Sequence, residues 1–210
     1  MIKPIDKIII VGGGSAGWMS AAALIKAYPN KKIFVIESPG IPTVGVGEST
    51  LGGINNFCQY LEIKDTDFMP YVDGSYKMSI KFTDFYEKDS GSFHYPFGKP
   101  FFNHTNNGLN DWMEKKALYP DTPIKDFVNT YFPSSYLFEQ NKITDKKFEN
   151  FDFNNDVAYH FDAAKFGSWL KQYYCLPRGV VHISDTVVNI ITDDTGIKLI
   201  VLENGQELTA

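Results

Sequence analysis

Apolar and polar residues are patterned differently in three successive zones of the chain, and the first zone, residues 1–61, is the most regular. An unbroken β-branched run at residues 7–11 predicts a strand that is buried on both faces. After several glycines, an Ala-rich stretch over residues 16–27 predicts a helix, and the apolar run at residues 31–37 predicts a second strand. This order indicates a βαβ unit with a parallel sheet, followed by a Pro- and Gly-rich connector and a helix over residues 54–61.

The middle zone, residues 62–156, has no long periodic pattern and is rich in aromatic residues. More than half of the Phe, Tyr and Trp residues of the chain lie between residues 82 and 160, with many Asn, Asp and Pro residues among them. One interpretation is a loop-rich insertion whose aromatic rings pack against one another, and composition by itself favours it. The alternative is a pocket lined for a flat, apolar ligand.

The last zone, residues 157–210, begins with apolar residues at helical spacing from Phe161 to Tyr174, which predict a helix. Strands and turns are then predicted in the order strand 180–192, turn 193–196, strand 197–202, turn 204–205 and strand 207–210. The chain thus stops inside an element, and we expect a C-terminal part of the fold to be missing.

The composition is that of an ordinary globular protein and excludes several classes. The 210 residues are 43% hydrophobic and 21% charged, which excludes a disordered, collagen-like or coiled-coil chain. The net charge of −5 lacks the basic excess of nucleic-acid-binding proteins, so we expect no nucleic acid partner. Two cysteines cannot form a disulfide framework, and the sequence has no evident targeting segment or membrane span. We therefore expect a cytoplasmic protein that does not bind membranes.

The strongest local motif is Gly12-x-Gly14-x-x-Gly17, which follows the first predicted strand and opens the first predicted helix. In this context the pattern is a dinucleotide-binding fingerprint: Gly12 permits the tight turn, Gly14 lets the backbone approach a pyrophosphate, and Gly17 lets helix and strand pack closely. Amide groups at the helix N-terminus would bind the phosphates. Glu37, at the end of the second strand, is placed to accept hydrogen bonds from ribose hydroxyls, which disfavours NADP and leaves NAD and FAD as alternatives.

A second glycine-bearing stretch, PTVGVGEST at residues 42–50, follows the βαβ unit. Its alternate glycines let the backbone lie close against a flat group, and Glu48, Ser49 and Thr50 are predicted to begin a helix with free amide groups. The alternative is an ordinary connector in which Ser49 or Thr50 caps the following helix.

These two stretches resemble a known family. GGGSAGWM at residues 12–19, followed by IPTVGVGEST at residues 41–50, is similar to the flavin-dependent halogenases, especially the tryptophan halogenase family. The pair Trp18-Met19 is a specific mark of that family among flavoproteins. The stretch at residues 41–50 resembles the segment with which the family contacts flavin, where Ala is commoner than Ser49.

A third stretch, SYKMSIKF at residues 75–82, resembles the segment that holds the catalytic lysine of the family, which aligns with Lys77 rather than Lys81. FHYPFG at residues 93–98 and YHFDA at residues 159–163 also resemble family segments. The resemblance therefore spans nearly the whole chain.

The resemblance implies an α/β fold with an FAD-binding Rossmann-like βαβ module, an aromatic-rich substrate-binding insertion and a β-meander, similar to flavin monooxygenases. Residues 1–61 would form the FAD-binding unit, residues 62–156 the substrate-side insertion, and residues 157–210 a helix and β-hairpin that return to the FAD-binding domain. FAD would be delivered as FADH2 by a separate flavin reductase, with O2 and chloride or bromide as co-substrates. The hypohalous acid formed from them would halogenate a small, electron-rich, indole- or phenol-like substrate through Lys77.

The resemblance also implies roles for individual residues. Lys77 would be catalytic, and Val187 matches a position that contacts the adenine end of the flavin. The residues expected to bind the cofactor are Gly12, Gly14, Ser15, Ala16, Gly17, Glu37, Ile41, Val44, Gly47, Glu48, Ser49 and Val187.

The segment around Lys77 does not by itself indicate catalysis, because strand alternation would put Lys77, Ser79 and Lys81 on one face of a surface strand. As a nucleophile, Lys77 must be a neutral amine whose pKa is lowered by burial. As a hydrogen-bond donor to hypohalous acid, the ammonium form would serve. The sequence leaves both roles open.

Two alternatives to a halogenase stay open: a flavin-dependent aromatic monooxygenase, which would not need halide, and a non-catalytic FAD-binding fragment. Members of the family are considerably longer, and their Trp-x-Trp-x-Ile-Pro segment and the later glutamate that partners the lysine are absent here. We therefore expect the N-terminal part of a halogenase or a reduced relative. The four histidines lack metal-ligand spacing, and no metal is expected.

Overall fold

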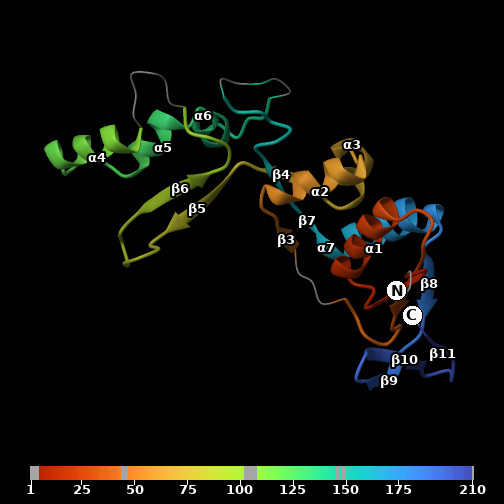
Figure 1. Ribbon diagram of the computed structural model, residues 1–210. Coiled ribbons are helices and arrows are strands. Elements are labelled where there is room, and N and C mark those ends of the chain that lie inside the picture. The colour runs from red at the N-terminus through yellow and green to blue at the C-terminus, as the bar shows by residue number, and fades with distance from the viewer. Residues whose placement is uncertain (1–4, 44–46, 102–107, 145–146, 148–149, 210) are drawn as a thin grey trace. The chain divides into compact units, whose positions relative to one another are not determined.

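The computed structural model describes residues 5–43, 47–101, 108–144, 147 and 150–209 (Figure 1). The chain forms two compact units. Unit 1 comprises Met1–Glu48, Phe57–Ser75 and Phe161–Ala210, and unit 2 comprises Ser49–Asn56 and Tyr76–His160.

Unit 1 is built on a three-stranded parallel sheet with the order β1-β2-β8. β1 (Lys7–Val11) and β2 (Lys32–Glu37) are connected by α1 (Ser15–Ala27), and β8 (Val181–Ser184) pairs with the other edge of β2. The predicted βαβ unit is confirmed, and its bounds differ from the prediction by no more than one residue. As the central strand, β2 is the most deeply buried of the three.

One face of α1 is buried against the C-terminal part of unit 1. The buried residues recur at helical spacing and are Trp18, Ala21, Ala22 and Ile25. This face contacts α7 (Ala163–Trp169) and the π-helical turn η2 (Leu170–Cys175), which is followed by the 3₁₀ turn η3 (Leu176–Arg178). Two alanines in the middle of the stripe allow the helices to approach closely.

The helix predicted over residues 161–174 is corrected at its start. Its first two residues end a strand, β7 (Ala158–Asp162), and the Asp162 carboxylate accepts a hydrogen bond from the Lys165 amide at 2.9 Å. This N-cap fixes the first residue of α7 at Ala163, because the capping residue itself must be extended.

A second sheet in unit 1 is antiparallel, with the order β11-β10-β9. Its strands are β9 (Val187–Asp193), β10 (Gly196–Leu202) and β11 (Glu207–Leu208). Both predicted turns and the beginning of a third strand are confirmed. The single strand predicted over residues 180–192 is instead two strands, β8 and β9. The chain changes partner between them, where the Asp185 amide donates to the Glu37 carbonyl at 3.1 Å.

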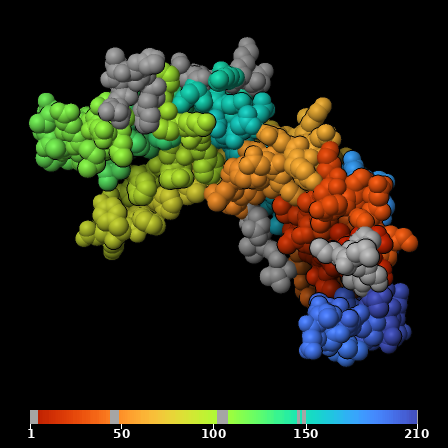
Figure 2. All heavy atoms as spheres, viewed as in Figure 1, coloured from red at the N-terminus to blue at the C-terminus, as the bar shows by residue number. Residues whose placement is uncertain are grey.

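Unit 2 contains more regular structure than its sequence predicts. It has an antiparallel hairpin of β5 (Ser79–Thr83) and β6 (Ser92–Pro96), and the helices α4 (Leu109–Leu118), α5 (Lys125–Tyr131) and α6 (Ser134–Glu139). Helices of six to ten residues complete too few turns to show a long periodic pattern. Figure 2 shows the hairpin in yellow-green, with side chains exposed at its surface.

The remaining elements are short. They are β3 (Gly47–Ser49), α2 (Gly53–Leu61), α3 (Asp65–Phe68), η1 (Met69–Tyr71) and β4 (Ser75–Lys77). The strands β3, β7 and β4 form a sheet with the order β3-β7-β4.

The prediction that a helix begins at residues 48–50 is wrong. Glu48 and Ser49 lie in β3, and the Thr50 amide donates to the Tyr159 carbonyl at 2.9 Å, while the next helix begins only at Gly53. The Thr50 hydroxyl also accepts a hydrogen bond from the Tyr159 amide at 2.8 Å, so it caps no helix. Sheet pairing with a distant strand therefore overrides the local helix-start signal.

We predict that Gly17→Ala destabilises unit 1. An added Cβ at residue 17 would lie 1.9 Å from the Gly12 carbonyl oxygen, so strand and helix would have to move apart. We expect a loss of about 1–3 kcal/mol in the free energy of unfolding, although helix propensity alone favours alanine by about 1 kcal/mol. Chemical denaturation measures this loss.

Gly53→Ala is the matched control, because it also places alanine in the first turn of a helix and its Cβ would meet none of the described residues within 4 Å. A Gly17→Ala protein as stable as the Gly53→Ala protein would contradict the close approach.

Candidate functional site

The glycine turn between β1 and α1 has the geometry of a phosphate-binding turn. Gly12 has a φ of +112°, which favours glycine, and its amide donates to the Ile36 carbonyl at 2.9 Å. Gly14 is extended, and its carbonyl accepts the first hydrogen bond of the helix from the Trp18 amide at 3.1 Å. The three amides between Gly14 and Trp18 therefore have no acceptor within the helix.

Those three amides belong to Ser15, Ala16 and Gly17, all predicted to bind the cofactor. Together with the helix dipole they favour a negatively charged group. The Ser15 hydroxyl donates to the Ala163 carbonyl at 2.6 Å, so this side chain anchors the start of α7. Ser15 therefore offers its backbone, rather than its hydroxyl, to a ligand.

Gly14 and Gly17 lack side chains for different reasons. Gly17 touches the Gly12 carbonyl, so the protein itself requires the absence of a Cβ there. Among the described residues, an added Cβ at residue 14 would meet only the Thr43 methyl group, at an ordinary contact distance of 3.6 Å. The packing of the described residues therefore does not require glycine at this position, whereas a pyrophosphate lying against the backbone would, so the turn fits a dinucleotide.

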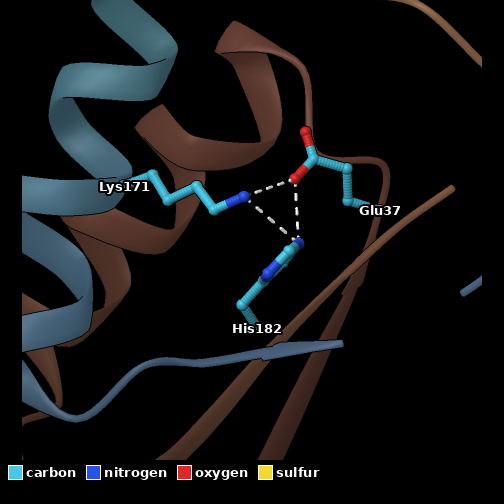
Figure 3. A network of polar contacts seen from close by, with 3 residues as sticks. All are labelled: Glu37, Lys171 and His182. Atoms are coloured by element: carbon cyan, nitrogen blue, oxygen red, sulfur yellow. Dashed lines mark hydrogen bonds and ion pairs between the residues drawn. The ribbon is translucent and has the colours of Figure 1, made fainter. Parts of the chain in front are cut away.

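Glu37 ends β2, and its carboxylate is held by two side chains from other segments (Figure 3). Lys171 Nζ, from η2, and His182 Nε2, from β8, each lie 2.9 Å from the same oxygen, Oε2. The Glu37 side chain also lies over the turn, because a Cβ at Gly13 would be 2.3 Å from its carboxyl carbon. The sequence gives no sign of a role for Lys171, His182 or Gly13 here, since no motif connects them to Glu37.

The surroundings of His182 favour its neutral form in this cluster. Burial and the positive charge of Lys171 lower the pKa of His182 by more than the Glu37 carboxylate raises it. A neutral imidazole close to a carboxylate must carry its hydrogen on Nε2. The 3.4 Å separation between Lys171 Nζ and His182 Nε2 then joins two donors and is no hydrogen bond.

The other predicted cofactor residues are spread more widely. Ile41 is exposed, Gly47 and Glu48 lie in β3, and Val44 is outside the described residues. Val187 begins β9 and packs against the apolar cluster of unit 1 that includes Ile36, Ile200 and Leu202. Its predicted contact with adenine stays a prediction.

Lys77 is the last residue of β4 and is only 7% exposed. Its Nζ donates to Ser49 Oγ at 2.6 Å and to the Thr50 carbonyl at 3.0 Å, and it lies 5.3 Å from the centre of the Phe97 ring. Burial lowers the pKa of the Lys77 amine below its ordinary value. All four residues belong to unit 2.

The surface strand that would place Lys77, Ser79 and Lys81 on one face is not found. The chain is interrupted at Met78, so that Lys77 belongs to the sheet of β3 and β7, whereas β5 pairs with β6. Lys81 is exposed, in contrast to Lys77. The change of pairing partner separates two lysines that simple alternation would place together.

Several aromatic residues of the middle zone form a packed core in unit 2. Tyr76 packs against Phe153, with 4.6 Å between ring centres, and against Tyr159, with 5.9 Å. The buried cluster here consists of Leu137, Phe151, Phe153 and Val157, with Tyr76 and Met78 packed against it. These residues agree with the first interpretation of the aromatic zone, and a ligand pocket stays a prediction.

Within the described ranges, no three His, Cys, Asp or Glu side chains lie together as metal ligands would. The helices of the same residues include none that is both long and apolar enough to span a membrane.

Comparison with known proteins gives a consistent family. The tryptophan halogenase family model matches residues 7–210. Tryptophan 6-halogenase ThaL of Streptomyces albogriseolus is 32% identical, over 93% of this chain and 39% of its own length.

Solved structures show the same relationship. The VirX1 apo structure is 42% identical, with a TM-score of 0.89 over 99% of this chain and 41% of that chain. Xcc4156, a flavin-dependent halogenase from Xanthomonas campestris, is 26% identical, with a TM-score of 0.85 over 99% of this chain and 41% of that chain. This chain therefore spans about two fifths of the length of these relatives. Its sequence and its fold together show that the chain belongs to the tryptophan halogenase family.

Proposed function

We propose that this chain is the flavin-binding and lysine-bearing part of an FAD-dependent halogenase that acts on an electron-rich, indole- or phenol-like aromatic compound. The observation that carries the proposal is Lys77, a buried lysine whose amine is held by Ser49 and Thr50. Family membership supports the reaction class, and the relative ThaL is named as a tryptophan 6-halogenase.

The glycine turn of unit 1 is the proposed FAD site. The amides of Ser15, Ala16 and Gly17 would bind the pyrophosphate, Gly14 would let it approach, and Glu37 would accept a hydrogen bond from ribose. When bound in its reduced form, which a separate flavin reductase would deliver, FAD would supply two electrons to O2. Chloride or bromide would supply two more, so that hypohalous acid and water are formed and FAD is left oxidised. The remaining sequence-predicted residues, Ile41, Val44, Gly47, Glu48, Ser49 and Val187, are proposed contacts of the same cofactor.

Lys77 would act as a neutral amine. Two acceptors among the described residues, Ser49 Oγ and the Thr50 carbonyl, lie within hydrogen-bond distance of Nζ. They match the two N–H bonds of a neutral amine and leave its lone pair for the electrophilic halogen. Burial supports this state, since it lowers the pKa of Lys77. An ammonium group would instead leave its third N–H bond to polarise hypohalous acid.

The proposal predicts halogenation that depends on Lys77. The chain would be incubated with FAD, a flavin reductase, NADH, O2, bromide and a panel of indoles and phenols, and the products identified by mass spectrometry. We expect Lys77→Met to reduce the yield of halogenated product by roughly 10²-fold or more without changing FAD binding. Lys81→Met is the control, because Lys81 is exposed and should retain the parent yield.

Three outcomes would count against the proposal in different ways. An equal yield from Lys77→Met and Lys81→Met would remove the role of Lys77. A hydroxylated product formed without halide would assign an aromatic monooxygenase. FAD binding without any product from the parent chain would identify a cofactor-binding part that does not turn over alone.

The lowered pKa of Lys77 also predicts a pH dependence of stability. Between its folded pKa and the ordinary value of about 10.4, the folded chain has released a proton that the unfolded chain still holds. The free energy of unfolding should therefore rise with pH in this window. Denaturation of the parent and of Lys77→Met at about pH 7.5 and about pH 10 measures the difference. Equal changes in both proteins would show that the pKa of Lys77 is not lowered.

A further inference from the structure

Glu37 is not a free carboxylate at the end of its strand. One of its oxygens, Oε2, lies 2.9 Å from Lys171 Nζ and 2.9 Å from His182 Nε2 (Figure 3). We propose that Lys171 and His182 are positioning residues which hold Oε2 and thereby present the other oxygen, Oε1, to the ribose hydroxyl of the bound dinucleotide. This inference rests on the proposed FAD site and adds two residues to it.

The two donors differ in charge and come from different segments. Lys171 is a cation on η2, whereas His182 is neutral and donates through Nε2–H from β8, the strand next to β2. Between 22% and 27% of each of the three side chains is exposed, so their interaction is screened less than that of a surface pair. The positive charge of Lys171 lies next to the Glu37 carboxylate, and the His182 imidazole adds a second donor to the same oxygen.

Trp18 forms a common support under both donors. Its side chain is only 1% exposed, and its ring lies 5.3 Å from Lys171 Nζ and 5.6 Å from the centre of the His182 ring. The indole attracts the Lys171 cation and limits the movement of both side chains. Trp18, the first residue of the Trp18-Met19 pair that marks the family, thus has a physical role in supporting the two donors. It lies in the first turns of the helix that follows the glycine turn.

Fixing Glu37 should matter because a glutamate has three rotatable side-chain bonds, of which the last is only weakly restricted. A mobile carboxylate loses its rotational freedom when it binds a ribose hydroxyl, and this loss of entropy weakens affinity for the ligand. Here Gly13 leaves space for the side chain over the turn, and the two donors hold one oxygen. Among the described residues, Oε1 has no hydrogen-bond partner, which is the state that a ribose ligand needs.

The test compares ADP with 2′-deoxy-ADP, two probes that differ only in the hydroxyl that Glu37 would bind. Dissociation constants would be measured by calorimetry for the parent, Lys171→Met and His182→Leu, with FAD as the reference ligand. We expect the parent to prefer ADP by roughly tenfold, the value of one charge-assisted hydrogen bond, and both variants to lose most of this preference.

Conservative variants separate positioning from loss of structure. Gln places an N–H donor near the position of Nε2, so His182→Gln should restore the preference for ADP, as should Lys171→Arg. Lys165→Met, which removes an exposed lysine of the same unit, should behave as the parent.

Two results would overturn the inference. If Lys171→Met and His182→Leu weaken ADP and 2′-deoxy-ADP by the same factor, the two residues are structural and do not act through the ribose hydroxyl. If the parent binds neither FAD nor ADP, the proposed cofactor site fails and this inference fails with it.

Discussion

The close contact between Gly17 and the Gly12 carbonyl is the constraint on which the cofactor side of this protein depends. Because residue 17 has no Cβ, the first turn of α1 can lie against the Gly12 carbonyl, directly after the end of β1. The same close packing brings the buried face of α1 against α7 and η2, which carries Lys171. The missing side chain at residue 17 thus allows the close packing of β1 and α1 at the glycine turn, next to the elements that hold Glu37.

The burial of Lys77 in unit 2 depends on a different kind of constraint. Lys77 is buried because its short strand pairs in the sheet of β3 and β7, while the chain immediately after it joins another sheet. Its amine finds acceptors on Ser49 and Thr50, at the end of the segment for which we propose flavin contacts. Burial lowers the pKa of the amine, and no carboxylate of the described residues pairs with it; a nucleophilic lysine requires a lowered pKa.

The features that the sequence predicts well are local ones. The βαβ unit, the turns at residues 193–196 and 204–205, and the glycine motif all depend on neighbouring residues, and their bounds are confirmed to within about one residue. Errors arise where a distant segment decides the structure. Thr50 pairs with Tyr159, 109 residues away, in place of starting a helix.

The same reason explains which site residues were missed. Lys171 lies 134 residues from Glu37 along the chain, and its residue type and spacing give no sign of the contact. Gly13 is recognisable as important only once the Glu37 side chain is seen to lie over it. Only the family resemblance indicates a catalytic role for Lys77, since strand alternation by itself predicts a surface residue.

If the glycine turn and Glu37 bind the ADP half of FAD, as we propose, the chain should discriminate strongly between FAD and FMN. Titration of this chain with each flavin, followed by flavin fluorescence, should show saturable binding of FAD that ADP displaces, and much weaker binding of FMN, which lacks the adenosine and the pyrophosphate. Equal affinity for FAD and FMN, or FAD binding that ADP does not displace, would contradict the claim.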